Sequence, residues 1–152
     1  TMPSLAEVEV LVDLLAELRH PTAWVSFSCM DDGRLRDGSA VEDAVAACRP
    51  EAGVVAVGVN CTAPRHVAGL VRRMRAVTDL PILAYPNSGE TYDAGSGRWT
   101  GRPSGRAWLE LVPMWIRAGA RIVGGCCRVG PEVIRDVRRT AMDAVAPPER
   151  EQ

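Results

Sequence analysis

The sequence has 152 residues, which is enough for one ordinary domain with a hydrophobic core. Its 18 basic and 19 acidic residues nearly cancel, so charge gives no reason to expect nucleic acid or a membrane surface as a partner. The sequence contains no apolar run long enough to span a bilayer and no signal-peptide pattern, which favours a cytoplasmic protein.

The predicted elements begin with an amphipathic helix over residues 5–18, for which Ser4 is a good N-cap and Glu7 its capping-box partner. Four strand–helix units follow. The strands are expected over residues 23–29, 53–61, 82–85 and 121–127, and the helices over residues 39–48, 64–77, 104–118 and 131–144. Ser39 is the expected cap of the first of these helices, and residues 86–103 are predicted to form a long polar loop.

This order of elements predicts an α/β fold. The strands are short and nearly all apolar, as in sheets that are covered on both faces. Repeated strand–helix units imply parallel strands with right-handed crossovers, which fits either an open doubly wound sheet or part of a (β/α)8 barrel. A whole barrel needs about 250 residues, so this chain could supply only about half of one. Both architectures place functional sites at the carboxyl ends of the strands.

Three cysteines lie at the carboxyl ends of two predicted strands. Cys61 ends one strand, and Cys126 and Cys127 end another, directly after Gly124 and Gly125. Neighbouring side chains on a regular strand point to opposite faces, so we expect the two glycines to relax the backbone and turn both sulfurs toward one point. Three thiolates suit a catalytic zinc ion, which takes three protein ligands and keeps a fourth position open.

Other interpretations of the cysteines remain. Cys126 and Cys127 could be small core residues, and a redox role for them is weakened because the sequence has no C-x-x-C motif. Cys29 also ends a predicted strand and could be a fourth thiol near the metal. Cys48 is expected to pack within a helix.

Two histidines and one tryptophan are expected to be structural. His20 and His66 lack ligand spacing; we expect His20 to end a helix and His66 to lie on a helix surface. Trp24 lies in a predicted strand and is expected in the core.

Three segments, in this order along the chain, resemble the homocysteine S-methyltransferase family. They are residues 58–64 (GVNCTAP), residues 85–90 (YPNSGE) with Tyr92, Asp93 and Trp99 downstream, and residues 124–127 (GGCC) with Pro131. That family includes zinc-dependent enzymes on a (β/α)8 TIM barrel. The resemblance implies that residues 1–146 are the C-terminal half of such a barrel, with roughly its last four strand–helix units, and that residues 147–152 are a polar tail.

The resemblance also implies an activity and a site. The activity is zinc-dependent transfer of a methyl group from a sulfonium donor, S-methylmethionine or S-adenosylmethionine, to homocysteine, giving methionine. The implied ligands of Zn²⁺ are Cys61, Cys126 and Cys127, and the implied substrate-binding residues are Asn60, Tyr85, Asn87, Glu90 and Trp99.

Each substrate-binding candidate also has a structural alternative. Asn60 and Asn87 could orient the metal ligands or satisfy backbone groups at strand ends. Glu90 could bind an amino group or cap a turn, and Trp99 could contact a substrate or anchor its loop. The loop over residues 86–103 is a candidate lid or wall of the donor site.

The chain departs from the family's pattern in two respects. The first four strands of the barrel, which hold most of the homocysteine-binding groups, have no counterpart in these residues, and Val129 and Gly130 stand where small hydroxylated residues are expected. A half-barrel exposes two sheet edges and an apolar interior, which predicts self-association or pairing with an N-terminal half. The alternative to an enzyme is therefore a non-catalytic zinc-binding half-barrel, or one part of a split enzyme that needs a partner chain.

Overall fold

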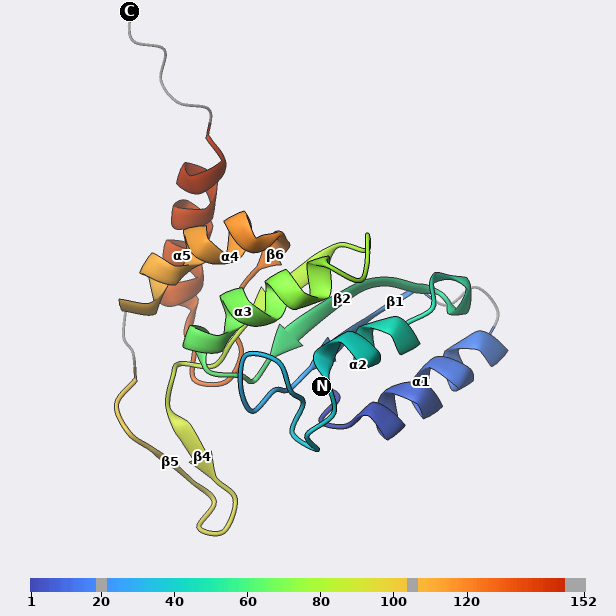
Figure 1. Cartoon of the computed structure of the whole chain (residues 1–152). Helices are drawn as coiled ribbons and strands as arrows, with labels where there is room; N and C mark the ends of the chain where they lie inside the picture. The colour runs from blue at the N-terminus through green and yellow to red at the C-terminus, as the bar shows by residue number, and fades with distance from the viewer. Residues whose placement is uncertain (19–21, 104–106, 147–152) are drawn as a thin grey trace, which may run out of the picture.

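The computed structural model describes residues 1–18, 22–103 and 107–146 and contains a four-stranded parallel sheet (Figure 1). The strands are β1 (Ala23–Phe27), β2 (Val54–Asn60), β3 (Ile82–Tyr85) and β6 (Ala120–Val123), which pair in that order. The helices are α1 (Leu5–Glu17), α2 (Val41–Ala47), α3 (Pro64–Arg75), α4 (Val112–Ala118) and α5 (Pro131–Val145), with short 3₁₀ turns at Pro50–Ala52 and Ala107–Leu111. The predicted α/β fold with parallel strands is confirmed.

The helix ends follow local capping chemistry. The Ser4 hydroxyl oxygen accepts the Glu7 N–H at 3.3 Å, which confirms the predicted N-cap of α1. The predicted cap of α2 is wrong. Helix α2 begins after Ala40 without a side-chain cap, because the Ser39 hydroxyl donates instead to Asp37 at 2.9 Å.

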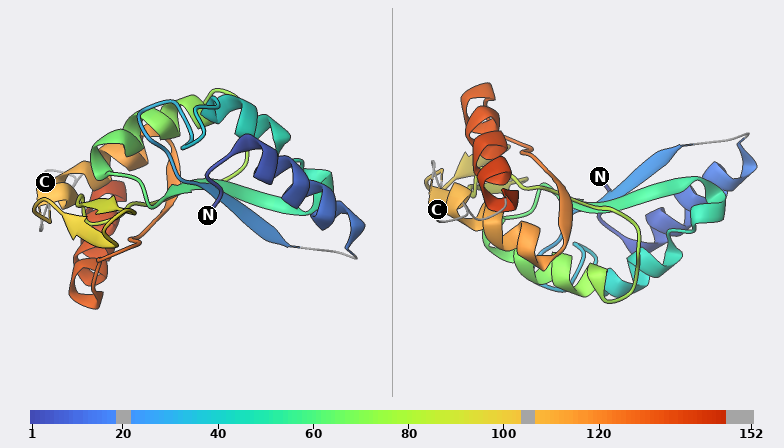
Figure 2. Two further views of the ribbon diagram at one scale, coloured as in Figure 1. Left: turned by 90° about the horizontal axis from the view of Figure 1, so that it is seen from below. Right: turned by 90° about the horizontal axis from the view of Figure 1, so that it is seen from above.

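The sheet is covered by helices on one face. Val25, Val57 and Ile82 are completely or almost completely buried on that face, in the hydrophobic core. Figure 2 shows α1 to α4 following this face, while no helix in the described part of the chain covers the opposite one. Trp24 and Ile122 lie on the open face and are 60% and 50% exposed, so the prediction that Trp24 is a core residue is wrong.

The open face is tightly packed near the carboxyl ends of the strands. A Cβ atom at Gly58 would lie 2.7 Å from the Leu83 Cβ on the neighbouring strand, so only glycine fits without a shift. The Tyr85 hydroxyl reaches past β2 and donates to the Ser26 hydroxyl oxygen at 2.6 Å. This end of the sheet is therefore held by side-chain contacts as well as by the strand ladder.

The segment predicted as an irregular loop over residues 86–103 contains an antiparallel hairpin, formed by β4 (Thr91–Asp93) and β5 (Arg98–Thr100). The Asp93 carboxylate accepts hydrogen bonds from the Gly95 N–H at 2.9 Å and the Ser96 hydroxyl at 2.5 Å, which shapes the turn. Figure 1 shows this hairpin projecting away from the body of the molecule. Three-residue strands with exposed polar neighbours carry little periodicity, so the sequence does not reveal them.

Some predictions concern residues that the structure does not describe: the position of His20, the start of a helix at residues 104–106, and the tail at residues 147–152.

The segment before α4 starts with the 3₁₀ turn at Ala107–Leu111 and continues as α4. Here the Trp108 ring stacks on the Trp115 ring, with ring centroids 5.4 Å apart. Helix α4 ends at Ala118, and Gly119 is its C-cap with φ of 119°. None of the described helices is long and apolar enough to cross a membrane.

Candidate metal centre

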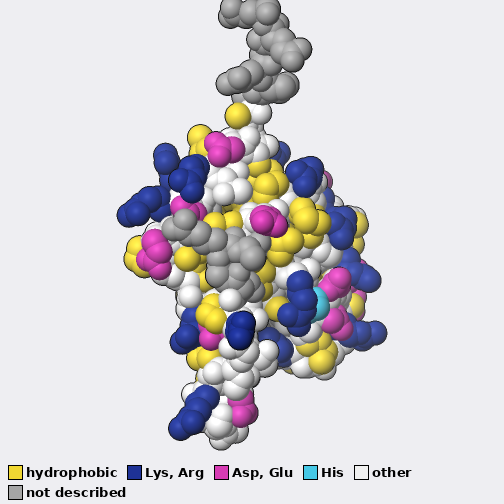
Figure 3. Space-filling view, turned by 90° about the vertical axis from the view of Figure 1, so that its left-hand side faces the viewer, with side chains coloured by type: hydrophobic (Ala, Val, Ile, Leu, Met, Phe, Trp, Pro, Cys, Tyr) yellow, Lys and Arg dark blue, Asp and Glu magenta, His cyan; other side chains and the backbone are white. Residues whose placement is uncertain are grey.

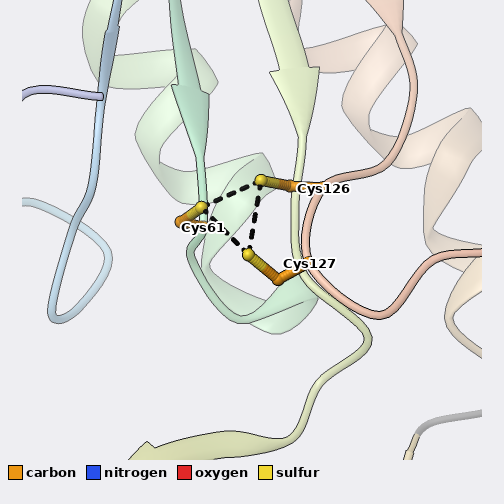
Figure 4. Close-up of side chains that lie close together, drawn as sticks. All are labelled: Cys61, Cys126 and Cys127. Carbon is orange, nitrogen blue, oxygen red and sulfur yellow. Dashed lines mark hydrogen bonds between the residues drawn. The ribbon is translucent and has the colours of Figure 1, made fainter. Parts of the chain in front are cut away.

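Three cysteine sulfurs meet at the carboxyl ends of two strands. Cys61 follows β2, and Cys126 and Cys127 lie in the loop after β6; Figure 4 shows their side chains pointing toward one another. The Sγ atoms are separated by 2.9 Å (Cys61–Cys126), 3.6 Å (Cys61–Cys127) and 3.9 Å (Cys126–Cys127). The predicted convergence is confirmed, and in the described part of the chain this is the group of side chains placed to hold a metal ion.

The spacing of the sulfurs fits a metal ion better than a disulfide. A tetrahedral ion with metal–sulfur bonds of about 2.3 Å places its sulfurs about 3.8 Å apart, close to two of the three separations. All three cysteines are free thiols, and a disulfide would need a sulfur separation of about 2.05 Å. Cys29 is not part of this group, and its backbone N–H donates to the Thr62 hydroxyl at 2.9 Å.

Two non-glycine residues with positive φ turn the chain at this site. Cys61 has φ of 49° and Arg128 has φ of 63°, a region that side chains other than glycine adopt at some cost. Gly124 and Gly125 do not adopt positive φ, so the prediction that glycine freedom turns the sulfurs is wrong. The strand simply ends at Val123, which frees the cysteines from alternation.

Gly125 has a different role, which is close packing. A Cβ atom there would lie 2.3 Å from the Val129 Cγ1 atom, so the absence of a side chain makes room for Val129. Val129 in turn donates its N–H to the Cys126 carbonyl at 3.2 Å and closes a tight turn around Cys127 and Arg128.

The loops after β3 and β6 are tied together by hydrogen bonds. The Cys126 N–H donates to the Pro86 carbonyl at 2.7 Å, and the Ser88 N–H donates to the Cys127 carbonyl at 3.1 Å. Glu90 is only 7% exposed, and its carboxylate accepts from Ser88 Oγ at 2.8 Å and from Arg128 Nε at 2.5 Å. These donors, Arg128 first, hold the pKa of the Glu90 carboxyl below its usual value.

The two asparagines differ in their contacts. The Asn60 amide nitrogen lies 3.4 Å from Cys61 Sγ and 3.8 Å from Cys126 Sγ, and it also donates to the Thr1 hydroxyl at 2.6 Å. Asn87 instead accepts the Gly89 N–H at 2.9 Å through its side chain. Asn60 therefore contacts two of the three sulfurs, whereas Asn87 contacts a backbone group of its own turn.

The thiols differ in acidity. Burial, followed by hydrogen bonding to Cys126 and Cys127, raises the pKa of Cys61 to about 12. Burial acts in the same direction on Cys126, but hydrogen bonds from Cys61, the Cys127 backbone and Asn60 outweigh it and lower the pKa of Cys126.

A cavity of about 630 Å³ opens beside the sulfurs. Its lining includes Cys61 and Cys127, Tyr92 and Trp99 from the hairpin, and three basic side chains, Arg36, Arg65 and His66. Among the predicted substrate-binding residues, Asn87, Glu90 and Trp99 line the cavity, while Asn60 and Tyr85 are outside its lining.

Several site residues cannot be recognised from sequence patterns. Arg36, Arg65 and Arg128 belong to a chain rich in arginine, and no motif distinguishes them from the others. His66, expected on a helix surface, is largely buried, contacts Asp32 and lines the cavity, although it is not part of the thiol group.

The model of the homocysteine S-methyltransferase family matches residues 1–141. The chain belongs to this family. It is 36% identical over 137 residues to a homocysteine S-methyltransferase of Bacillus subtilis, covering 90% of this chain and 44% of that protein. It is 40% identical over 132 residues to a homocysteine S-methyltransferase of Escherichia coli, covering 86% of this chain and 43% of that protein.

The solved structures of the homocysteine S-methyltransferase family agree with the fold. The metallated form of the homocysteine methyltransferase MmuM from Escherichia coli superimposes with a TM-score of 0.73 at 33% identity, covering 90% of this chain and 42% of that one. This chain therefore spans about two fifths of the length of the family members it matches.

Proposed function

We propose that this chain supplies the metal-binding part of a zinc-dependent homocysteine S-methyltransferase, which moves a methyl group from S-methylmethionine or S-adenosylmethionine to homocysteine. The observation that carries this proposal is the meeting of the Cys61, Cys126 and Cys127 sulfurs beside a cavity at the carboxyl ends of the strands. The names of the relatives support homocysteine as the acceptor, and the existence of a metallated form of MmuM supports a metal ion in this family.

We also propose that residues 1–146 form the C-terminal half of a (β/α)8 barrel, followed by a tail. The support is a parallel sheet that, among the residues the structure describes, has helices on one face only, with a site at its carboxyl end (Figure 2). On the outer edge of β1 the structure places Met2, which accepts the Ser28 N–H at 3.0 Å and donates to the Ser26 carbonyl at 2.8 Å. A parallel neighbour on that edge is the pairing expected from a preceding barrel strand.

In this proposal the three cysteines hold Zn²⁺ and Asn60 fixes the directions of two of their sulfurs. Bound zinc supplies an open fourth coordination position and lowers the pKa of a thiol that occupies it. The negative charge of the three cysteine thiolates keeps an acceptor sulfur at this position electron-rich and nucleophilic.

The methyl transfer itself balances without an acid from the protein. A new bond forms between the homocysteine sulfur and the methyl carbon while the bond between that carbon and the donor's sulfonium sulfur breaks. The donor sulfur keeps the electron pair and leaves as a neutral thioether, and the thiol proton of homocysteine goes to solvent when the thiol binds. The task of the cavity is therefore to align the three reacting atoms and exclude water.

The test follows a carbon-deuterated homocysteine into methionine by mass spectrometry, with either donor. It is run on the zinc-loaded chain alone and on the chain coexpressed with the N-terminal half of the Escherichia coli relative. We expect labelled methionine in the second sample, and none when Cys127 is replaced by serine. In a parallel sample loaded with Co²⁺, homocysteine should change the visible absorption; no change there and no labelled methionine would refute the proposal.

Replacing Glu90 by glutamine is expected to weaken zinc binding about tenfold, as is typical when a group that supports the ligands is changed. The reason is that Glu90 anchors Arg128 and Ser88, whose backbones adjoin or bond to Cys127. Zinc affinity is measured by competition with a coloured chelator, and Glu110→Gln, an exposed carboxylate on the turn before α4, is the matched control.

The same variant should change the pH dependence of stability. Because the folded-state pKa of Glu90 is depressed below 4.5, its stabilising effect is present above about pH 4.5 and disappears as the pH falls through the depressed value. Glu90→Gln should therefore lose less thermal stability than the unmodified chain on acidification. Equal zinc affinity and an unchanged pH profile would contradict this role.

A further inference from the structure

The β4–β5 hairpin brings two aromatic rings to the cavity beside the sulfurs. Tyr92 and Trp99 are paired across the two strands, with ring centroids 5.3 Å apart and planes tilted by 52°. Both line the cavity together with Cys61 and Cys127. Tyr92 remains 53% exposed, so the hairpin keeps aromatic surface accessible to a bound molecule instead of burying it.

Among the side chains that line the cavity, the aromatic pair of Tyr92 and Trp99 is the part best suited to bind a cation. Glu90, a carboxylate in the lining, already accepts hydrogen bonds from Arg128 and Ser88. The Arg36 and Arg65 side chains also line the cavity, and among the described residues the structure gives neither an acidic hydrogen-bond partner. Guanidinium groups attract a carboxylate and repel a cation, whereas an aromatic face attracts a cation.

We propose that Tyr92 and Trp99 form the subsite for the positively charged onium group of the methyl donor, with Arg36 and Arg65 on the side that receives its carboxylate. This inference rests on the proposed methyl transfer. A neutral aromatic surface suits a donor whose positive charge vanishes in the reaction. The attraction holds the sulfonium before transfer and ends once the donor has become a thioether, which favours release of the product.

A purely structural role would give the same two rings another purpose. Cross-strand aromatic pairs stabilise hairpins, and a pair that did only this would be indifferent to the charge of a ligand. The distinguishing measurement is therefore the preference between two ligands that differ in charge. S-methylmethionine and methionine share one carbon skeleton and differ by one methyl group and one positive charge.

The experiment is calorimetric titration of the zinc-loaded full chain with each ligand. We expect S-methylmethionine to bind about tenfold more tightly than methionine, within the range of cation–π contacts. Trp99→Leu and Tyr92→Leu should remove this preference, and Trp99→Phe should keep part of it. Trp24→Leu is the matched control, because Trp24 is an exposed tryptophan on the open sheet face, outside the cavity lining.

Equal binding of the two ligands by the unmodified chain, or an unchanged preference in Trp99→Leu, would overturn the inference. If the leucine variants fail to fold, the preference for S-methylmethionine over methionine in the unmodified chain and in Trp99→Phe still tests the inference. Homocysteine binding to the Co²⁺-loaded samples separates this result from the proposed function. A change in cobalt absorption without an onium preference refutes only the subsite, whereas an onium preference that depends on Trp99 supports the subsite even if homocysteine does not bind.

Discussion

Replacing Cys126 by serine is expected to abolish zinc binding. Chain purified without added metal should contain close to one Zn²⁺, measured by plasma mass spectrometry, and the Cys126→Ser chain should contain almost none. The Cys126 Sγ atom is 2.9 Å from the Cys61 Sγ atom, and its loss removes one of the three thiolates that are proposed to hold the ion. The affinity should fall by more than the roughly 100-fold upper limit typical of changes outside the ligand set.

The control for this variant is Cys48→Ser. Cys48 is 5% exposed, lies at the end of α2 and donates its thiol to the Ala44 carbonyl at 3.3 Å, and it is not part of the group of three thiols. Its replacement should leave the zinc content unchanged. Absence of zinc from the unmodified chain, or equal zinc in Cys126→Ser, would show that the three sulfurs meet without serving a metal, and the catalytic proposal would fall with it.

The 152-residue chain by itself is expected to self-associate. Several exposed apolar side chains lie on α1, on the open face of the sheet and on α5, and each of these is 50% or more exposed: Val10, Leu14, Trp24, Ile122, Met142 and Val145. Figure 3 shows hydrophobic side chains gathered at the surface on the side where α4 and α5 lie. Size-exclusion chromatography with light scattering at micromolar concentrations should give a mass above the 16.4 kDa of one chain.

Charged substitutions on the apolar surface test the cause of this association. Leu14→Glu together with Ile122→Lys should shift the chain toward the monomer, because a buried contact with either charge would be costly. Glu9→Lys, an exposed change on a charged position of α1, is the control and should not do so. A chain that stays monomeric at high concentration without any substitution would contradict the expectation that this surface needs a partner.

The regular elements could be predicted because their physical signals are local. Strand β3 agrees with its predicted bounds, and α1 begins at the residue after its predicted cap. The meeting of Cys61 with Cys126 was also predictable, since the carboxyl ends of parallel strands lie at one edge of a sheet. For these cysteines, their position at the ends of predicted parallel strands is enough to predict that they lie close together.

The remaining features depend on contacts that the sequence does not encode locally. The sequence of an apolar strand does not show which of its two faces a helix covers, so the pattern around Trp24 and Val25 predicts a buried Trp24 although this side chain is exposed. The pairing of Glu90 with Arg128 joins residues 38 positions apart, and either residue could equally have been a solvated surface charge. The left-handed backbone at Cys61 is imposed by its surroundings, against the intrinsic preference of the residue.

Because the sulfurs belong to residues that are far apart in the sequence, a bound metal ion would also affect the stability of the fold. Cys61 and Cys126 are 65 residues apart, and β3 lies between the strands that carry them. An ion held by both would act as a reversible cross-link that closes this long loop and restricts the unfolded chain. Loop-closure entropy puts the effect of such a link on the order of 4 kcal/mol. The ion that the proposed chemistry needs would thereby also hold together two distant parts of the fold, and a chelator would remove both contributions at once.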